Sequence, residues 1–267
     1  GDKQALLVER PLPEIVHEQV PPTLPLEEWT TWTWEDYLAD VRRAAKGFML
    51  LGLQPFESVI VWGFNSPEWH ISCIGAMFSG GKCAPLHHLD TPEMSAYKVV
   101  HSCGSIVVVQ DRAMVDRLAH ALSDRRDCKR LKAFVAYGFS QIEGETVQIR
   151  GCEAVRVLRW SAVLDMGCKS GDDNALKERC AATKPGHCAA LIYTSGTTGA
   201  PKAVMLSHDN IIYVASAFLE VTARSVGFSS SPKQERLLSY LPLSHITGMM
   251  FEVVCPILAC ARKPCWV

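Results

Sequence analysis

Short apolar runs alternate with longer amphipathic stretches along residues 58–137. Each apolar run has the length of a strand and is followed by apolar positions at helical spacing. Continuous apolar runs are typical of parallel strands covered on both faces, and parallel neighbours need a crossover helix between them. The alternation therefore predicts an α/β fold with a doubly wound, mostly parallel sheet flanked by helices on both sides. The predicted strands are 58–64, 82–86, 105–110 and 132–137, and helices are expected at 67–79, 92–102 and 112–122.

Three of the expected helix starts carry capping residues. Thr33 and Asp36 have the spacing of a capping box, ahead of an amphipathic stretch that ends at Gly52. Ser66-Pro67-Glu68 and Thr91-Pro92-Glu93 each place a hydroxyl cap, a proline and an acid in that order. These signals predict where the chain turns from loop into helix.

The two ends of the chain differ in character. Residues 1–28 hold five prolines and little periodicity, which predicts an extended amino-terminal segment, and residues 29–267 are expected to form the domain. In the second half, the pattern predicts a short helix at 160–166, a buried strand at 189–193, a helix after Ser207 and a strand at 236–241.

Composition narrows the class of protein. With 48% hydrophobic residues, 21% charged residues and a formal net charge of -1, the chain has the profile of a globular protein, and no basic track predicts nucleic-acid binding. No apolar run approaches the roughly twenty residues of a membrane span, and no secretory leader is visible. The 11 cysteines lack a C-x-x-C pair, so we interpret them as reduced thiols of a cytoplasmic protein.

The most informative stretch is Leu191–His208, in which a buried strand is followed by a loop of small hydroxylated residues and glycines. The loop offers hydroxyl donors, exposed backbone N–H groups and one cation, which together suit a polyphosphate. A hydroxyl-rich turn between strands would also tolerate this composition. The spacing is not that of a Walker A loop, because two glycines lie too close together and Ala203 follows Lys202. The predicted phosphate-binding residues are Thr194, Ser195, Gly196, Thr197, Thr198, Gly199, Ala200, Pro201 and Lys202.

The order T-S-G-T-T-G-A-P-K at 194–202 resembles the signature of the adenylate-forming superfamily. That superfamily contains acyl-CoA synthetases, luciferases and the adenylation domains of peptide synthetases. Further stretches resemble the long-chain fatty acid–CoA ligases of the bubblegum group, namely 44–48, 63–69, 204–207 and 238–246. Two departures accompany the match: Ala203 stands where the family usually has glycine, and residues 83–90 lack the serine- and threonine-rich turn common there.

The resemblance implies a reaction and its reactants. It implies that a long-chain fatty acid is activated with ATP to an acyl-adenylate and passed to CoA, with Mg²⁺ accompanying the nucleotide and held mainly by phosphates and water. It also implies that His245 lies beside the acyl carboxylate as a wall of the acid pocket. Without the resemblance, His245 would be interpreted as a structural histidine at a helix start. Peripheral association with the endoplasmic reticulum or another membrane is a further expectation of this kind.

Several alternatives remain open at this point. His87, His88 and Asp90 could be drawn as metal ligands, but they directly precede the Thr91 cap and are interpreted as turn residues. The family's adenine, ribose and carboxyl-terminal lysine motifs are not found in the sequence, so the chain resembles the amino-terminal part of such an enzyme and is expected to be inactive alone. A catalytically dead adenylate-fold fragment that acts as a binding or regulatory module is the second hypothesis.

Overall fold

The molecule is built on one large mixed sheet. The computed structural model describes residues 2–11, 21–123, 125, 128–138, 145–150, 152–171, 173–194, 200–226 and 236–262. Eight strands form the sheet in the order β10-β9-β4-β3-β5-β6-β8-β7. Their bounds are β3 (Ser58–Trp62), β4 (Lys82–Leu86), β5 (Gly104–Val109), β6 (Ala133–Ala136), β7 (Glu145–Val147), β8 (Val155–Arg159), β9 (Cys188–Thr194) and β10 (Lys202–Ser207).

The sheet is parallel at its centre and antiparallel at both edges. β3 pairs in parallel with β4 on one side and β5 on the other, and β6, β8 and β9 continue the parallel pattern. β10 pairs antiparallel with β9, and β7 pairs antiparallel with β8. The predicted doubly wound, mostly parallel sheet is therefore confirmed, although β10 and the β7–β8 pair were not predicted.

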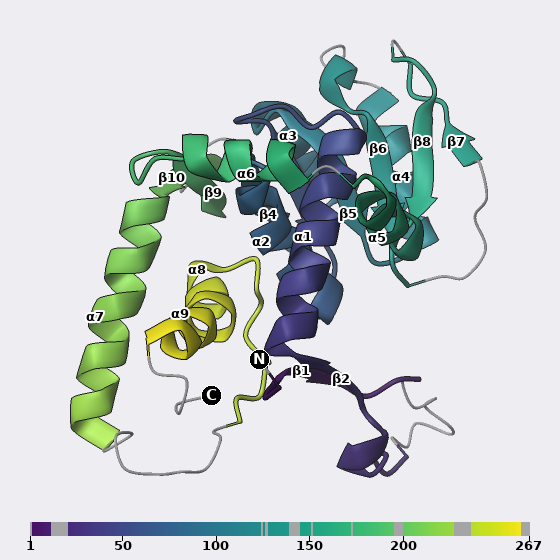
Figure 1. Cartoon of the computed structure of the whole chain (residues 1–267). Coiled ribbons are helices and arrows are strands. Elements are labelled where there is room, and N and C mark those ends of the chain that lie inside the picture. The colour runs from purple at the N-terminus through teal and green to yellow at the C-terminus, as the bar shows by residue number, and fades with distance from the viewer. Residues whose placement is uncertain are drawn as a thin grey trace.

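Helices cover both faces of the sheet, as Figure 1 shows. α1 (Trp34–Leu50), α2 (Pro67–Phe78) and α5 (Trp160–Lys169) pack together on one face, and α3 (Pro92–His101) and α4 (Arg112–Ser123) pack together on the other. Side chains of β3 alternate between the two cores: Val59 and Val61 join the first, and Ile60 and Trp62 join the second. Strand residues buried in this way explain why the apolar runs of the sequence are continuous.

Local capping signals act as the sequence predicts. The Ser66 hydroxyl accepts a hydrogen bond from the Trp69 N–H at 3.2 Å, and the Thr91 hydroxyl accepts one from the Met94 N–H at 3.3 Å. Thr33 and Asp36 form the expected reciprocal capping box at the start of α1. Such bonds satisfy N–H groups that the first turn of a helix leaves without partners.

The amino-terminal segment contributes a small second sheet. β1 (Gln4–Val8) pairs antiparallel with β2 (Thr30–Thr33), directly before α1. The short helix η1 (Leu26–Glu28) lies between them in the sequence. The division into residues 1–28 and 29–267 is not tested by these contacts and stays a prediction.

The last part of the described chain packs beside the large sheet. α6 (Asp173–Ala182) leads to β9, and α7 (His208–Val226) follows β10. α8 (Ile246–Gly248), the π-helical η3 (Met249–Val254) and α9 (Cys255–Arg262) form one continuous helical stretch, which lies between α7 and α1 in Figure 1. Among the described helices, none combines the length and apolarity that crossing a bilayer requires.

The predicted strand at 236–241 is wrong. The structure gives these residues an irregular backbone, and Leu237, Leu238 and Tyr240 are 62%, 77% and 73% exposed. The N–H groups of Tyr240 and Leu241 donate to the Glu252 carboxylate at 3.3 and 2.9 Å rather than to a neighbouring strand. The Glu252 carboxylate therefore accepts the backbone hydrogen bonds that a neighbouring strand would accept in a sheet.

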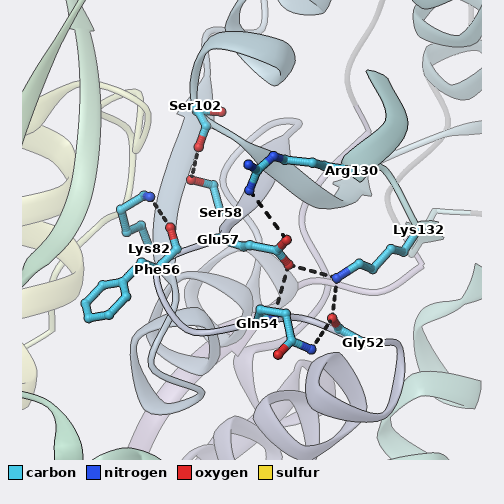
Figure 2. A network of polar contacts seen from close by, with 9 residues as sticks. All are labelled: Gly52, Gln54, Phe56, Glu57, Ser58, Lys82, Ser102, Arg130 and Lys132. Carbon is cyan, nitrogen blue, oxygen red and sulfur yellow. Dashed lines mark hydrogen bonds and ion pairs between the residues drawn. The ribbon is translucent and has the colours of Figure 1, made fainter. Parts of the chain in front are cut away.

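A polar network closes the amino-terminal edge of the sheet (Figure 2). Glu57, 9% exposed, accepts hydrogen bonds from Lys132 Nζ and from the Gln54 N–H, both at 2.9 Å, and Lys132 also donates to the Gly52 carbonyl oxygen. Burial alone would raise the pKa of Glu57, but these bonds outweigh it and hold the pKa below its usual value. This edge is filled by helix ends and their partners, so the carboxyl-terminal edge is the one left for ligands.

Candidate functional site

The signature segment forms a β-hairpin at the edge of the large sheet. Thr194 ends β9 and lies opposite Lys202, which begins β10, and the Thr194 hydroxyl donates to the Lys202 carbonyl oxygen at 3.5 Å. Both residues are exposed. Because β9 runs parallel to β4, the hairpin turn lies at the carboxyl ends of the parallel strands, where open α/β sheets bind their ligands.

The predicted phosphate-binding residues fall into two groups. Ser195, Gly196, Thr197, Thr198 and Gly199 lie outside the described residues, so their role stays a prediction.

The other four, Thr194, Ala200, Pro201 and Lys202, flank that turn. Ala200 is exposed, and the carbonyl oxygen of Pro201 accepts a hydrogen bond from the Tyr97 hydroxyl at 3.3 Å. Within the described part of the chain, no carboxylate forms an ion pair with Lys202.

Helix α3 anchors the end of β9 beside the hairpin turn. The Tyr193 hydroxyl donates to the Lys98 carbonyl oxygen at 3.1 Å and lies 3.0 Å from His101 Nδ1. Burial raises the pKa of Tyr193, so the phenol stays protonated and keeps its donor. The strand that carries Thr194 is thereby fixed to the body of the sheet.

The turn after β4 brings two histidines to the same edge of the sheet. His88 stacks between Phe64 and His87, with ring centroids 4.7 and 4.4 Å apart. Asp90 accepts hydrogen bonds from the His87 N–H at 3.0 Å and from Lys98 Nζ at 2.5 Å. Asp90 thus organises the turn, in agreement with the interpretation of these side chains as turn residues. Over the described ranges, no group of three His, Cys, Asp or Glu side chains is arranged to hold a metal ion.

The surroundings of His87 lower the pKa of its imidazole. Burial lowers its pKa below the usual value, and the neighbouring His88 adds to the effect. Asp90 opposes the shift, whereas Lys98 and His245 reinforce it. The contribution from His245 indicates that this histidine lies near the same turn.

His245 stands exposed at the start of α8. Its ring Nδ1 accepts a hydrogen bond from the Thr247 N–H at 3.3 Å. The backbone N–H of His245 donates to the Pro242 carbonyl oxygen at 2.9 Å. The capping contact is the one expected of a structural histidine. The Nε2 side of the ring is not used by that contact, so the predicted role beside an acyl carboxylate stays open.

Two polar residues, the half-buried Asn65 and the buried Glu252, hold the segment that leads to His245. The Asn65 amide donates to the Leu241 carbonyl oxygen at 2.8 Å and to the Ser239 hydroxyl at 2.9 Å, and it accepts from the Leu243 N–H at 3.3 Å. Glu252, 6% exposed, accepts from the Ser239 hydroxyl at 2.5 Å and from the backbone N–H groups of the same segment. Asn65 also donates to Glu252 at 3.3 Å, which joins the carboxyl end of β3 to η3.

Sequence reasoning did not single out this pair. Asn65 lies in the stretch 63–69 that resembles the family, but nothing local assigns it a partner. Glu252 is an isolated acid in the apolar run from Met249 to Val254. The position of Glu252 within an apolar run was the available signal, because a buried charge needs hydrogen-bonding or charged partners.

The mostly parallel sheet, with the signature hairpin at its carboxyl edge, agrees with the adenylate-forming class that the sequence resembles. The chain belongs to the AMP-binding enzyme family, whose model matches residues 13–263. It is 36% identical over 231 residues to the long-chain-fatty-acid–CoA ligase ACSBG2 of Gallus gallus, and 32% identical over 231 residues to the ACSBG2 of Homo sapiens. These relatives confirm the resemblance to the bubblegum group.

The match covers most of this chain and a smaller part of each relative. It takes in 86% of this chain, but the chain spans 28% of the length of the chicken relative and 32% of the human one. Among solved structures, ATP-bound MatB from Rhodopseudomonas palustris is similar, with a TM-score of 0.61, 20% sequence identity, and coverage of 86% of this chain and 39% of that one. At this identity the likeness establishes the fold.

Proposed function

We propose that this chain supplies the polyphosphate site and one wall of the acid site of a long-chain fatty acid–CoA ligase. Such an enzyme joins a fatty-acid carboxylate to the α-phosphorus of ATP and releases pyrophosphate. The thiol of CoA then attacks the acyl carbon of the acyl-adenylate, a thioester forms, and AMP leaves. The hairpin carries the proposal: Thr194 and Lys202 lie opposite each other at the carboxyl edge of the sheet, and Lys202 has no carboxylate partner among the described residues.

The phosphate side follows from donor chemistry. Lys202 and the hydroxyl groups of Thr194, Ser195, Thr197 and Thr198 would bind the β- and γ-phosphates while negative charge develops on the leaving pyrophosphate. Mg²⁺, when bound, neutralises the phosphates. It would be held mainly by phosphate oxygens and water, as is usual for Mg²⁺ that accompanies a nucleotide.

The acid side depends on His245. Its unused ring nitrogen can donate a hydrogen bond to a carboxylate, and the contacts of Asn65 and Glu252 fix the backbone before it. A fixed backbone before His245 suits a side chain that must orient the attacking carboxylate oxygen of the fatty acid. Neither Asn65 nor Glu252 would touch the substrate, so both are positioning residues.

The complete reaction exceeds what this sequence offers. The chain spans about a third of its curated relatives, and the family's adenine, ribose and carboxyl-terminal lysine motifs are not found in it. We therefore propose binding without turnover for the isolated chain. A cytoplasmic location, with peripheral association at the endoplasmic reticulum or another membrane, belongs to the same proposal.

A non-reactive acyl-adenylate analogue, 5′-O-(N-palmitoylsulfamoyl)adenosine, tests the acid side. Replacing His245 by Ala should weaken its binding by roughly tenfold, the usual effect of one lost hydrogen bond to a charged group, whereas His120→Ala on the exposed side of α4 should not. Calorimetric titration measures both. An unchanged affinity in His245→Ala would remove His245 from the proposed site.

A second candidate function is a binding or regulatory module. The exposed apolar side chains of α7 and of residues 236–240, among them Tyr213, Val221 and Leu238, favour it because such surfaces commonly contact another protein. A folded chain that self-associates and binds neither ATP nor the analogue would support this alternative.

A further inference from the structure

Helix α3 contacts both strands of the signature hairpin, close to where each strand meets the turn. The Tyr193 hydroxyl, on β9, donates to the Lys98 carbonyl oxygen of α3 at 3.1 Å. In the other direction, the Tyr97 hydroxyl of α3 donates to the Pro201 carbonyl oxygen, directly before β10, at 3.3 Å. We refer to Tyr97 and Tyr193 as the tyrosine pair, because together they link α3 to both sides of the turn.

Each of these hydrogen bonds fixes the backbone beside a predicted phosphate-binding residue. The Pro201 carbonyl oxygen and the Lys202 N–H belong to one planar peptide group, so the bond from Tyr97 orients the backbone at Lys202. Tyr193 directly precedes Thr194, so its bond to α3 restricts the backbone there in the same way. Thr194 and Lys202 are also cross-strand partners. The tyrosine pair therefore fixes both residues relative to α3.

Ring contacts hold the tyrosine pair itself. Tyr97 stacks on His101 with ring centroids 5.3 Å apart, and the same His101 meets Tyr193 edge-on at 5.8 Å. His101 Nδ1 lies 3.0 Å from the Tyr193 hydroxyl oxygen. Lys98 Nζ lies 5.3 Å from the centre of the Tyr193 ring and forms an ion pair with Asp90, in which the two side chains are 6% and 7% exposed. Both rings therefore have defined positions before a ligand binds.

The two hydroxyl groups can be removed without leaving a buried acceptor unpaired. The Lys98 carbonyl oxygen also accepts a hydrogen bond from the Ser102 N–H at 2.9 Å, so it keeps a partner in Tyr193→Phe. Pro201 lies between the exposed residues Ala200 and Lys202, where water can take the place of the Tyr97 hydroxyl. Loss of either hydroxyl should therefore have a small effect on folding.

We propose that Tyr97 and Tyr193 are positioning residues for polyphosphate binding, an inference that rests on the proposed function of the hairpin. Both act through the backbone beside Lys202 and Thr194. A ligand that contacts both of these residues binds more tightly when the protein already holds them in place, because less conformational freedom is lost on binding. The β- and γ-phosphates of ATP depend on this arrangement, whereas AMP has neither phosphate.

Calorimetric titration of the full chain with ATP and Mg²⁺, and separately with AMP, tests the inference. In Tyr97→Phe the affinity for ATP should fall about threefold, and in the double variant with Tyr193→Phe roughly tenfold, while the affinity for AMP stays unchanged. The midpoint of thermal unfolding of Tyr97→Phe should stay within about 3 °C of the wild type. The control Tyr213→Phe, at a side chain that is 73% exposed on α7, should change none of these values.

Hydrogen–deuterium exchange measures the effect on the hairpin without any ligand. Deuterium uptake at residues 202–207 should rise in Tyr97→Phe, because this strand loses its hydrogen bond to α3, and should stay unchanged in Tyr213→Phe. Unchanged uptake in Tyr97→Phe would overturn the inference, whatever the nucleotide affinities.

The nucleotide titrations separate the inference from the proposed function. Equal affinities of the wild type for ATP and AMP would overturn the proposed function and, with it, the role of the tyrosine pair. A wild type that prefers ATP, together with a Tyr97→Phe variant that binds ATP equally well, would overturn the inference alone. An equal fall in affinity for ATP and AMP, with a lowered unfolding temperature, would show that the tyrosine pair only stabilises the fold.

Discussion

Single buried polar side chains decide how the candidate acid site is built, and Glu252 is the main one. Its carboxylate lies in an apolar helical stretch and is retained because Ser239, Tyr240, Leu241 and Asn65 all donate to it. A buried charge without such partners would be strongly destabilising. The same bonds keep residues 239–241 out of a strand and direct the chain toward α8.

Replacing Glu252 by Gln should destabilise the protein by about 1.5–3 kcal/mol, because an amide cannot accept all of these bonds and one of its NH₂ hydrogens would face a donor. Urea unfolding measures the change. The control Glu220→Gln, in the exposed pair with Arg224 on α7, should cost less than about 0.5 kcal/mol. Equal effects in the two variants would show that the Glu252 contacts do not hold this segment.

His70 should make stability fall at mildly acidic pH. Its folded-state pKa of about 4 lies below the usual 6.5, so the unfolded chain takes up a proton first as the pH drops. Above about pH 6.5 both states are neutral and the full stability is present, and between pH 6.5 and 4 about 3 kcal/mol should be lost. Chemical unfolding of the wild type and of His70→Phe across this window should differ in slope, while the exposed His120→Phe should match the wild type. Parallel curves for wild type and His70→Phe would contradict the buried neutral imidazole.

Residues with local partners could be predicted from the sequence, and residues with distant partners could not. Thr33, Ser66 and Thr91 act on N–H groups three residues ahead, so their spacing alone defines them. Asn65 and Glu252 are 187 positions apart, and only the packing of η3 against the end of β3 brings them together. Lys202 was predicted to bind phosphate because it belongs to the signature stretch 194–202. Its position opposite Thr194 could not be derived from the sequence.

At the scale of elements, the parallel strands were predictable and the edge strands were not. β3 to β6 are buried on both faces, which leaves continuous apolar runs in the sequence. β10 is largely exposed and mixes apolar and polar residues without alternation, so its strand depends on pairing with β9. At 236–241 a strand was predicted where there is none. The apolar run is there, but its backbone N–H groups donate to Glu252 instead of to a neighbouring strand.

The amino-terminal edge of the sheet depends on cations that satisfy helix ends. Arg179 of α6 donates to the Leu53 carbonyl oxygen at 2.9 Å and to the Ser79 carbonyl oxygen at 3.1 Å, just after α1 and α2 end. Replacing Arg179 by Ala should therefore destabilise the protein by about 1.5–3 kcal/mol. Thermal unfolding checks this against the exposed control Lys129→Ala, which should stay within about 0.5 kcal/mol of the wild type. An Arg179→Ala protein as stable as the control would contradict the role given to this contact.

At the scale of the whole molecule, exposed apolar side chains are concentrated on α7. Tyr213 and Val221 of α7 are 73% and 63% exposed. The protein should therefore bind the dye 1-anilino-8-naphthalenesulfonate, and Tyr213→Lys with Val221→Lys should bind clearly less, because contiguous exposed apolar surface is what the dye reports. Fluorescence titration measures this, with Leu38→Lys on α1 as the control outside the region. Dye binding that is unaffected by the α7 changes would contradict the exposure of this face.

The central claim is that the hairpin from Thr194 to Lys202 binds a polyphosphate, and calorimetric titration of the folded chain with ATP and AMP tests it most directly. ATP with Mg²⁺ should bind more tightly than AMP, which lacks the β- and γ-phosphates. Lys202→Ala should weaken ATP binding by roughly tenfold or more, the equivalent of about 1.5–3 kcal/mol for one charged contact, while the exposed Lys169→Ala should leave it unchanged. Equal affinities for ATP and AMP, or an ATP affinity that Lys202→Ala does not alter, would contradict the account.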